Sequence, residues 1–540
     1  MNLRNEKFTR RFFLKLIAVS SAWMAMGTLK LADAKQDIVI LLGRPSDGDT
    51  MDPANSNFKA NHINNEHLYE RLVFPGVEGD RCPWLVEELE HSEDFTEWIF
   101  KVKTDQGIKF HCGKSLTVED VKVTLDRLLY ATRISSKYQK FANKESITII
   151  NDHTIKIKLT KPVPLFGSVE TCNHSFGVIC SKCMKENATE DDPWAFDWFS
   201  KNACGTGPFK LKYWNKGEKV VYEKFSDYWG GPKICSHHPR KAYSDKLIHV
   251  VIKDSAARKM ALEKGTIDIA SYLTGDQIKS LEKQPGIKIY NIPLPNITYI
   301  GFDVRATPFN NEKVRKAIAY AINYEEIIKG PEQGFAERIY SLNDKGFLGY
   351  SPDEYLHYNY DPEKSKKLLK EGGYPNGFST TLTFGVERRQ QFEEEAVYLQ
   401  SYLKDVGIEV KLQNVAFASQ NEMTKGKYEG MVLHTYQCSG GDPDVCLGWR
   451  IAPSRKANWA YGWDICHWDD PVAYYTQKAG LIADQEKRAE LYNELSKVMM
   501  NKAIAIPLYT YGVILAARDN IDNLFYHPRY TYNWWEVQKR

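Results

Sequence analysis

The residues best suited to chemistry in this chain are cysteines and a histidine that lie close together in the sequence. Cys180 and Cys183 form a C-x-x-C pair, and Cys172 and His174 precede it by a few residues. Thiolates and an imidazole at such spacing could hold zinc, or the C-x-x-C pair could act as a redox couple. Because the chain has no second C-x-x-C, oxidation to disulfides is the simpler prediction.

The chain has ten cysteines in all. In an exported protein this number favours disulfides, although sequence alone does not give their pairing. Cys204 and Cys235 belong to the same early group as the C-x-x-C pair, whereas Cys438, Cys446 and Cys466 come late. Cys446 and Cys466 could join the two ends of the loop between them.

Other catalytic patterns are missing or incomplete. The stretch 107–115 ends in Gly-Lys-Ser, but Ile108 stands where a phosphate-binding loop needs its first glycine. The sequence has no G-x-S-x-G and no H-E-x-x-H, and His237-His238 beside Cys235 lacks a clear metal-ligand spacing. We therefore predict that the protein is not an enzyme, with no cofactor and no assigned metal ligand.

The N-terminus has the pattern of an export signal. Arg10-Arg11 precedes a mostly apolar run, 16–29, and Ala32-Asp-Ala34 forms a small-x-small cleavage pattern. The apolar run is too short to span a bilayer comfortably, which disfavours a membrane anchor. We predict a twin-arginine signal peptide at residues 1–34, which would carry the chain across the membrane already folded.

Composition limits the remaining choices. About 500 of the 540 residues remain after processing, enough for two or three domains. The 72 lysines and arginines nearly balance the 69 aspartates and glutamates, so nothing favours nucleic acid as a partner. Aromatic residues make up 13% of the chain, which permits a large aromatic-lined pocket.

The elements that would position such a pocket follow from local patterns. Residues 380–386, 391–406 and 408–412 read as strand, helix and strand, so we expect a βαβ unit and a parallel or mixed sheet. Asn310 or Asn311 is predicted to cap one helix that runs on to Ile327 and ends at Gly330-Pro331. Asp361-Pro362 is predicted to begin another helix.

The most informative segment begins at Gly205-Thr-Gly-Pro208. Gly205 and Gly207 would supply backbone freedom at a turn, and the alternating residues after Pro208 predict a strand entering a hairpin. This stretch, continued by Tyr228-Trp-Gly-Gly-Pro232, resembles the signature of the family 5 extracellular solute-binding proteins, the peptide and nickel receptors of ABC importers.

Other segments extend the resemblance from about residue 37 to residue 509. Leu68-Tyr-Glu-Arg-Leu-Val73 is similar to the family's LYEGLV, with Arg71 where glycine is more usual. The helix after the strand 296–303 is similar to the family's V-R-x-A-I-x-x-A-I pattern, and 503–509 ends in the family's Pro-Leu-Tyr.

The resemblance implies an α/β, two-lobed periplasmic binding protein fold (type II, cluster C) with an extra domain inserted in the first lobe. The implied domains are a lobe I core at 35–72, 205–292 and 512–540, an extra domain at 73–204, and lobe II at 293–511. In this family the ligand is enclosed between the lobes by a hinge motion.

The resemblance also implies ligand contacts. Arg388 or Arg389 takes the place of the family's arginine for the peptide carboxylate, and we choose Arg388. Ser439 occupies the place of the aspartate that holds the ligand ammonium, and Asp442 could substitute if the loop shifts by three residues. The predicted aromatic contacts are Tyr436, Trp449, Trp459, Tyr461 and Trp463.

We therefore predict a monomeric periplasmic receptor of a Gram-negative cell that delivers a peptide or peptide-like solute to ABC transporter permeases and ATPases. Because Ser439 replaces the usual aspartate, a receptor for nickel or another metal chelate is the alternative within the fold. The alternative of another class is a twin-arginine-exported metal or redox protein that uses Cys172, His174, Cys180 and Cys183.

Overall fold

The structure is a computed structural model. It describes residues 37–55, 59–75, 81–130, 139, 142–167, 174–231, 242–343, 345–386, 389, 391–425, 428–437, 443, 447, 474–475, 478–524 and 534–540. The chain divides into two compact units, Met1–Asp37 and Ile38–Arg540. The predicted signal peptide lies outside the described residues.

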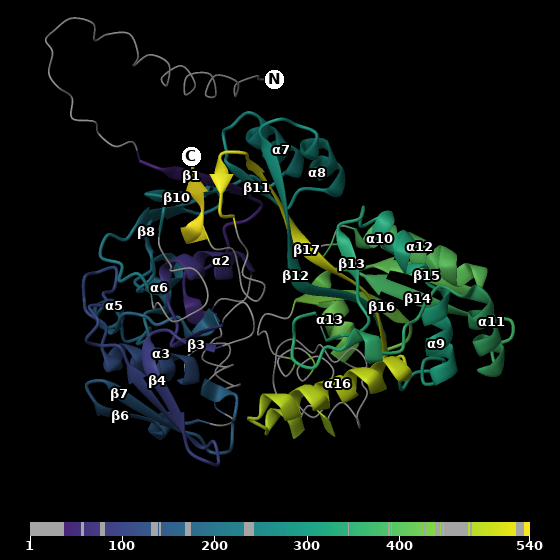
Figure 1. Ribbon diagram of the computed structural model, residues 1–540, viewed down its shortest axis with the longest axis horizontal. Helices are drawn as coiled ribbons and strands as arrows, with labels where there is room; N and C mark the ends of the chain where they lie inside the picture. The colour runs from purple at the N-terminus through teal and green to yellow at the C-terminus, as the bar shows by residue number, and fades with distance from the viewer. Residues whose placement is uncertain are drawn as a thin grey trace, which may run out of the picture. The chain divides into compact units, whose positions relative to one another are not determined.

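The second unit is built on one large mixed sheet. Eleven strands form it, in the order β15-β14-β16-β12-β17-β11-β1-β10-β9-β8, with β13 paired to β17 off this path (Figure 1). The strands are β1 (Val39–Arg44), β8 (Phe209–Asn215), β9 (Lys219–Lys224), β10 (Lys246–Val251), β11 (Ile269–Ser271), β12 (Ile287–Phe302), β13 (Ala336–Arg338), β14 (Phe378–Phe384), β15 (Ile408–Asn414), β16 (Met431–Gln437) and β17 (Ala505–Arg518).

Two long strands connect the halves of this sheet. The first part of β12, 287–292, pairs with 513–518 of β17, and the second part, 296–301, pairs with 505–511. The pairing register shifts between Ile292 and Asn296. Strands β11, β1, β10, β9 and β8 lie on one side of the β12–β17 pair, and β16, β14 and β15 lie on the other. Any movement of one half against the other must therefore bend these two strands.

The predicted βαβ unit is confirmed. β14 and β15 pair in parallel, and α12 (Phe392–Asp405) connects them. The apolar face of α12 joins a core cluster that also holds residues of β12, β14, β16 and β17. The helix predicted after Asp361-Pro362 is also confirmed, as α11 (Pro362–Glu371), whose N-cap Asp361 accepts from the Lys364 N–H.

The single helix predicted from Asn311 to Gly330 is wrong. The chain forms α9 (Glu312–Ala321) and α10 (Tyr324–Lys329), because Ile322 has extended backbone and Asn323 caps the second helix by accepting from the Glu326 N–H. An asparagine side chain that bonds nearby backbone offers an alternative to continued helix, and here that alternative prevails.

A second, antiparallel sheet lies within residues 86–158. It has the order β4-β5-β7-β6, formed by β4 (Val86–His91), β5 (Glu97–Val102), β7 (Thr154–Lys158) and β6 (Ile147–Asn151). Helix α3 (Val118–Tyr130) packs against it, and the two share a core cluster with Phe176, Cys180 and Cys204. This sheet falls inside the range predicted for the extra domain.

The remaining short elements complete the described parts of the fold. They are β2 (Val73–Pro75), β3 (Arg81–Pro83), β18 (Ile521–Asp522), β19 (Gln538–Lys539), η1 (Pro53–Asn55), α2 (Lys59–Leu68), η2 (Lys144–Ser146), η4 (His174–Phe176), α5 (Ser181–Asn187), α6 (Phe196–Lys201), α7 (Ser255–Glu263), α8 (Gly275–Glu282), η5 (Pro352–Glu354), α13 (Phe417–Lys425), α16 (Gln485–Asn501) and η7 (Trp534–Glu536).

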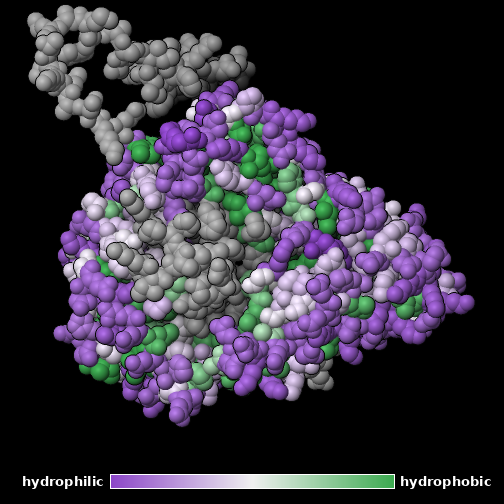
Figure 2. Space-filling view, viewed as in Figure 1, coloured by the Kyte–Doolittle hydropathy of each residue, from purple (hydrophilic) through white to green (hydrophobic). Residues whose placement is uncertain are grey.

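Within the described ranges, no helix combines the length and the hydrophobicity needed to cross a membrane. Figure 2 shows that the face in view is largely hydrophilic, with separate small groups of hydrophobic side chains.

The segment at Gly205 forms the predicted hairpin, β8 and β9, but its glycines act differently from the prediction. Neither Gly205 nor Gly207 has a positive φ. A Cβ on Gly205 would lie 2.0 Å from the Leu68 carbonyl oxygen, and one on Gly207 would lie 2.4 Å from that of His67. Glycine is needed here because the segment passes directly against the end of α2.

The buried carboxylate of Glu70 ties the same segment to its surroundings. Its Oε1 accepts from Trp84 Nε1 at 2.8 Å and Tyr228 Oη at 2.9 Å. Its Oε2 accepts from Thr206 Oγ1 at 2.8 Å and Trp229 Nε1 at 2.9 Å. The aromatic residues of Tyr228-Trp-Gly-Gly are thus held through Glu70, which stands in the Leu68–Val73 segment.

Candidate functional site

Of the eight predicted ligand contacts, the structure describes one. Arg388, Ser439, Asp442, Trp449, Trp459, Tyr461 and Trp463 lie outside the described residues. Tyr436, in β16, is 2% exposed and packs edge-to-face on Tyr299 at 5.7 Å between ring centroids. Its hydroxyl donates to the Leu342 carbonyl. Tyr436 is packed in a core cluster here, and a contact with ligand stays a prediction.

Arg389, the residue after Arg388, forms an ion pair inside the protein. Arg389 lies between β14 and α12, where the resemblance places a ligand-binding arginine. Its side chain is 9% exposed and bonds through Nη2 to both carboxylate oxygens of Glu332. Its Nε lies 3.8 Å from Oε1 of Glu395, a carboxyl that is fully buried. Arg389 is thus an internal ion-pair partner in this structure.

Two tyrosines of β17 complete this cluster. The guanidinium carbon of Arg389 lies 3.7 Å from the ring centroid of Tyr511 and 5.6 Å from that of Tyr509. The Tyr509 hydroxyl lies 2.7 Å from Oε1 of Glu395 and 3.3 Å from Oε1 of Glu332. A cation over aromatic rings in a desolvated setting is attracted by their quadrupoles. Arg389, Glu332, Glu395, Tyr509 and Tyr511 are called the Arg389 cluster below.

Burial sets the protonation states in the Arg389 cluster. Burial, reinforced by the nearby Glu332 carboxylate, raises the pKa of Glu395 well above its usual range. Burial disfavours the charged guanidinium, but the attraction of Tyr509, Glu332, Tyr511 and Glu395 prevails and raises the pKa of Arg389 well above its ordinary value. The Arg389 cluster thus favours a charged Arg389 and makes the Glu395 carboxyl easier to protonate than a carboxyl in water.

The Arg389 cluster sits on the strands that join the two halves of the sheet. Tyr511 pairs with Asn296 of β12, at the point where the register of the two strands shifts. Its hydroxyl lies 3.2 Å from Thr435 Oγ1, which in turn donates to the Ile297 carbonyl at 3.1 Å. Arg389 is therefore linked, through Tyr511, to the connecting strands.

Sequence reasoning did not find the other members of the Arg389 cluster. One signal was available: Glu395 falls on the same face of its helix as Phe392 and Leu399, where an apolar residue would be expected. The pairing of Glu332 with Arg389 joins residues 57 positions apart and leaves no local pattern.

Four cysteines form a different cluster that could hold a metal ion. The sulfur atoms of Cys112, Cys180, Cys183 and Cys204 all lie within 4.8 Å of one another. All four are free thiols, so the oxidised pairing predicted for Cys180 and Cys183 is not present. Of their predicted companions, Cys172 and the side chain of His174 lie outside the described residues.

Comparison with known proteins identifies the family. The sequence model of the bacterial extracellular solute-binding proteins, family 5 (middle), matches residues 82–457, more than half of the 540-residue chain. The chain belongs to this family. The family resemblance of the Gly205 segment is therefore confirmed. The protein is a solute-binding protein.

Relatives match nearly end to end. The dipeptide-binding protein of Escherichia coli K12 is 28% identical over 468 residues, covering 81% of this chain and 83% of its own. The glutathione-binding protein of the same strain is 26% identical over 530 residues, covering 95% and 96%.

A solved structure supports the architecture. The ABC transporter-associated periplasmic binding protein of Helicobacter pylori, in complex with the peptide STSA, superposes with a TM-score of 0.75 at 25% identity. The match covers 93% of this chain and 98% of that one. The predicted two-lobed α/β binding-protein fold is confirmed, and the paired strands β12 and β17 run through both halves of its sheet.

Proposed function

We propose that this chain captures a peptide or peptide-like solute outside the cytoplasm and delivers it to an ABC importer. The observation that carries the proposal is the near-complete match to a solved binding protein that holds a peptide, with 93% of this chain covered. Its function would be binding and delivery and not catalysis, and its partners would be the permeases and ATPases of the importer.

Within this proposal, Arg388 binds the ligand carboxylate. Its neighbour Arg389 already has its charge compensated by Glu332 and rests on Tyr511, which favours the adjacent arginine for the ligand. An arginine fork matches the two oxygens of a carboxylate through parallel N–H donors. The Arg389 cluster would then hold the Arg388 loop in place and would not itself contact the ligand.

The segment 438–444 would bind the ligand ammonium, through Ser439 or Asp442. A single hydroxyl is a weak partner for a buried ammonium, so a serine in this place favours either the nearby Asp442 or a ligand with other polar groups. The aromatic contacts would come from Tyr436, Trp449, Trp459, Tyr461 and Trp463. Such contacts do not require one particular side chain on the ligand.

Closure would use the connecting strands. β12 and β17 pair on both sides of the register shift at Ile292 to Asn296, and a hinge at this shift would bring the sheet halves together over the ligand. The proposed domain limits stay those given by the sequence, with lobe I at 35–72, 205–292 and 512–540, the extra domain at 73–204, and lobe II at 293–511.

The remaining assignments concern the mature protein. We place it in the periplasm as a monomer, exported by the twin-arginine route after cleavage behind Ala34. Disulfides are proposed among the late cysteines, with Cys446 to Cys466 as the first pairing to test.

The proposal is tested by thermal unfolding of the mature chain, residues 35–540, against di- to pentapeptides and nickel chelates. A ligand at about 100 times its dissociation constant should add about 2.7 kcal/mol to the free energy of unfolding. A rise with peptides is expected. A rise with chelates alone would move the assignment to the metal-chelate receptor, and no rise with any solute would overturn the peptide proposal.

A further inference from the structure

Four cysteines converge from three separate segments of the chain. Cys112 lies in the turn before α3, Cys180 and Cys183 lie at the start of α5, and Cys204 precedes the Gly205 segment. Cys180, Cys183 and Cys204 are 0%, 8% and 3% exposed, whereas Cys112 lies at the surface. We propose that these four thiolates bind one zinc ion in a tetrahedral site.

The separation of the sulfur atoms agrees with a shared ion. A disulfide would place two sulfurs about 2.05 Å apart. Four thiolates around one zinc at about 2.3 Å stand at the corners of a tetrahedron whose edge is about 3.8 Å. Cys112 Sγ and Cys180 Sγ are 3.6 Å apart, and all four sulfurs fit within 4.8 Å of one another. A redox pair would need only two of them.

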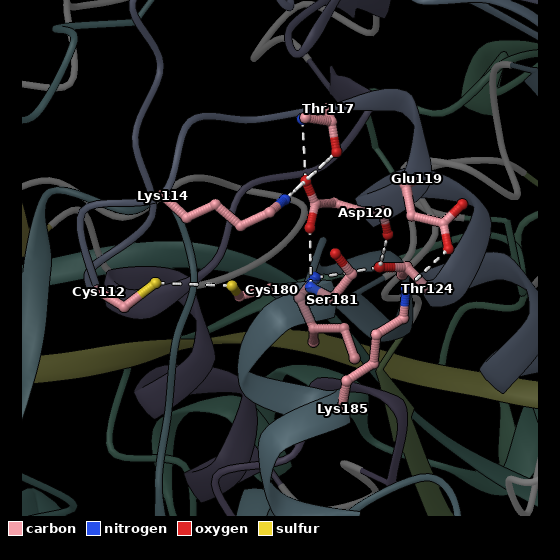
Figure 3. A network of polar contacts seen from close by, with 10 residues as sticks. Cys112, Lys114, Thr117, Glu119, Asp120, Thr124, Cys180, Ser181 and Lys185 are labelled. Carbon is pink, nitrogen blue, oxygen red and sulfur yellow. Dashed lines mark hydrogen bonds and ion pairs between the residues drawn. The ribbon is translucent and has the colours of Figure 1, made fainter.

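The backbone on both sides of Cys180 is held by hydrogen bonds to α3. In Figure 3, Asp120 of α3 lies between the two helices, and its Oδ1 accepts from the Ser181 N–H at 2.8 Å. On the other side of Cys180, the Ile179 N–H donates to Thr124 Oγ1 at 3.1 Å. Cys180 is thus held by hydrogen bonds on both sides.

Asp120 is itself held in place. Its Oδ2 accepts from the Thr117 N–H at 2.9 Å and from Thr117 Oγ1 at 2.7 Å, and it forms an ion pair with Lys114 (Figure 3). Lys114 follows Cys112 by two residues, so the same network ties the turn that carries Cys112 to the start of α5. Supporting contacts of this kind orient metal ligands.

The remaining segments are joined by backbone contacts. The Cys180 N–H donates to the Cys204 carbonyl at 3.2 Å. The His111 N–H donates to the Gly205 carbonyl at 2.9 Å, and its Nε2 lies 3.1 Å from the Gly207 carbonyl oxygen. Gly113, with φ of +87°, turns the chain back directly after Cys112. Hydrogen bonds within the protein thus hold the segments that carry Cys112, Cys180 and Cys204.

The zinc site would join the antiparallel-sheet region to the Gly205 segment, where hydrogen bonds to Glu70 already meet. The role is structural, because all four zinc positions are taken by protein ligands and none stays open for a substrate. Twin-arginine export, predicted from Arg10-Arg11, would carry the chain folded, so the site would fill in the cytoplasm, where thiols stay reduced.

Metal analysis of the exported chain, purified without chelator, tests this site. We expect about one equivalent of zinc per chain. We also expect all four cysteines to resist alkylation until a chelator and denaturant are added, as read by peptide mass spectrometry without reductant. Replacement of the metal by cobalt should give the visible absorption of a tetrahedral thiolate site, a readout that needs no variant.

Two variants sharpen the test. Cys112→Ser, at the surface ligand, should lower zinc affinity at least about 100-fold, because losing a direct ligand should exceed the loss of a supporting contact. Cys172→Ser is the matched control and should keep its zinc. Less than about a tenth of an equivalent of zinc with the four cysteines in disulfides would overturn the proposal, as would iron in place of zinc, or zinc loss in Cys172→Ser alone.

Discussion

The guanidinium of Arg389 lies 3.7 Å above the ring of Tyr511, and it reaches that position while paired with Glu332. This contact joins the loop between β14 and α12 to β17, one of the two strands shared by both halves of the large sheet. The two adjacent arginines would therefore have different roles. Arg389 stabilises the loop, and Arg388 is left as the proposed ligand contact.

Arg388→Ala should weaken peptide binding at least about tenfold without changing stability, since it removes a charge-assisted fork to the ligand carboxylate. Arg389→Ala is the matched comparison. It should lower the free energy of unfolding by about 3 kcal/mol, because it leaves the buried Glu332 carboxylate without its cation. Titration calorimetry and denaturant unfolding measure the two effects. Unchanged affinity in Arg388→Ala would remove it from the site.

Glu395 should make stability depend on pH in a defined direction. Its pKa is raised in the folded state, so the folded chain keeps the proton while the unfolded chain releases it above about pH 4.3. Stability should therefore be lost as pH rises from about 4.3 toward the folded-state pKa. Glu395→Gln stays neutral and can still accept from Tyr509, so its stability relative to wild type should be greater at pH 8 than at pH 4.

The control for this prediction is Glu393→Gln, on the exposed face of the same helix, which should change stability by less than about 0.5 kcal/mol at either pH. Urea unfolding at pH 4 and pH 8 gives the comparison. Greater destabilisation of Glu395→Gln at pH 8 than at pH 4 would mean that Glu395 is ionised in the folded protein.

Glu70→Gln should destabilise the protein by about 2–4 kcal/mol, because an amide turns one accepting oxygen into a donor that faces buried donors. Trp84, Thr206, Tyr228 and Trp229 all donate to this carboxylate. Glu90→Gln, exposed on β4, should have little effect in the same denaturant unfolding experiment. Equal stability of the two variants would show that the Glu70 contacts add nothing.

Sequence predicted those parts of the fold whose signals are local. The caps at Asn311 and Asp361 and the strand–helix–strand unit ending at β15 are visible within a few residues, and the structure has them. The break at Asn323 was missed because the apolar spacing runs on through it to Ile327. The roles of Gly205 and Gly207 were misread because the clash that requires glycine comes from α2, more than a hundred residues earlier.

The sites were less predictable, for the same physical reason. Cys180 and Cys183 form a C-x-x-C that is visible in the sequence, but Cys112 is 68 residues away from Cys180 and joins the cluster only through folding. The resemblance allows Arg388 or Arg389 as the ligand-binding arginine, but only the tertiary structure shows that Arg389 pairs with Glu332. Contacts between residues far apart in the chain have no fixed spacing, so a local sequence pattern cannot predict them.

Peptide binding is tested most directly by calorimetric titration of the mature chain with a di- or tripeptide, beside the same peptide with its amino terminus acetylated or its carboxyl terminus amidated. We expect saturable binding at one site, with a dissociation constant of about 1 μM or tighter, equivalent to about −8 kcal/mol, and at least tenfold weaker binding of the amidated peptide. Absence of binding across peptides of several lengths and compositions would contradict it.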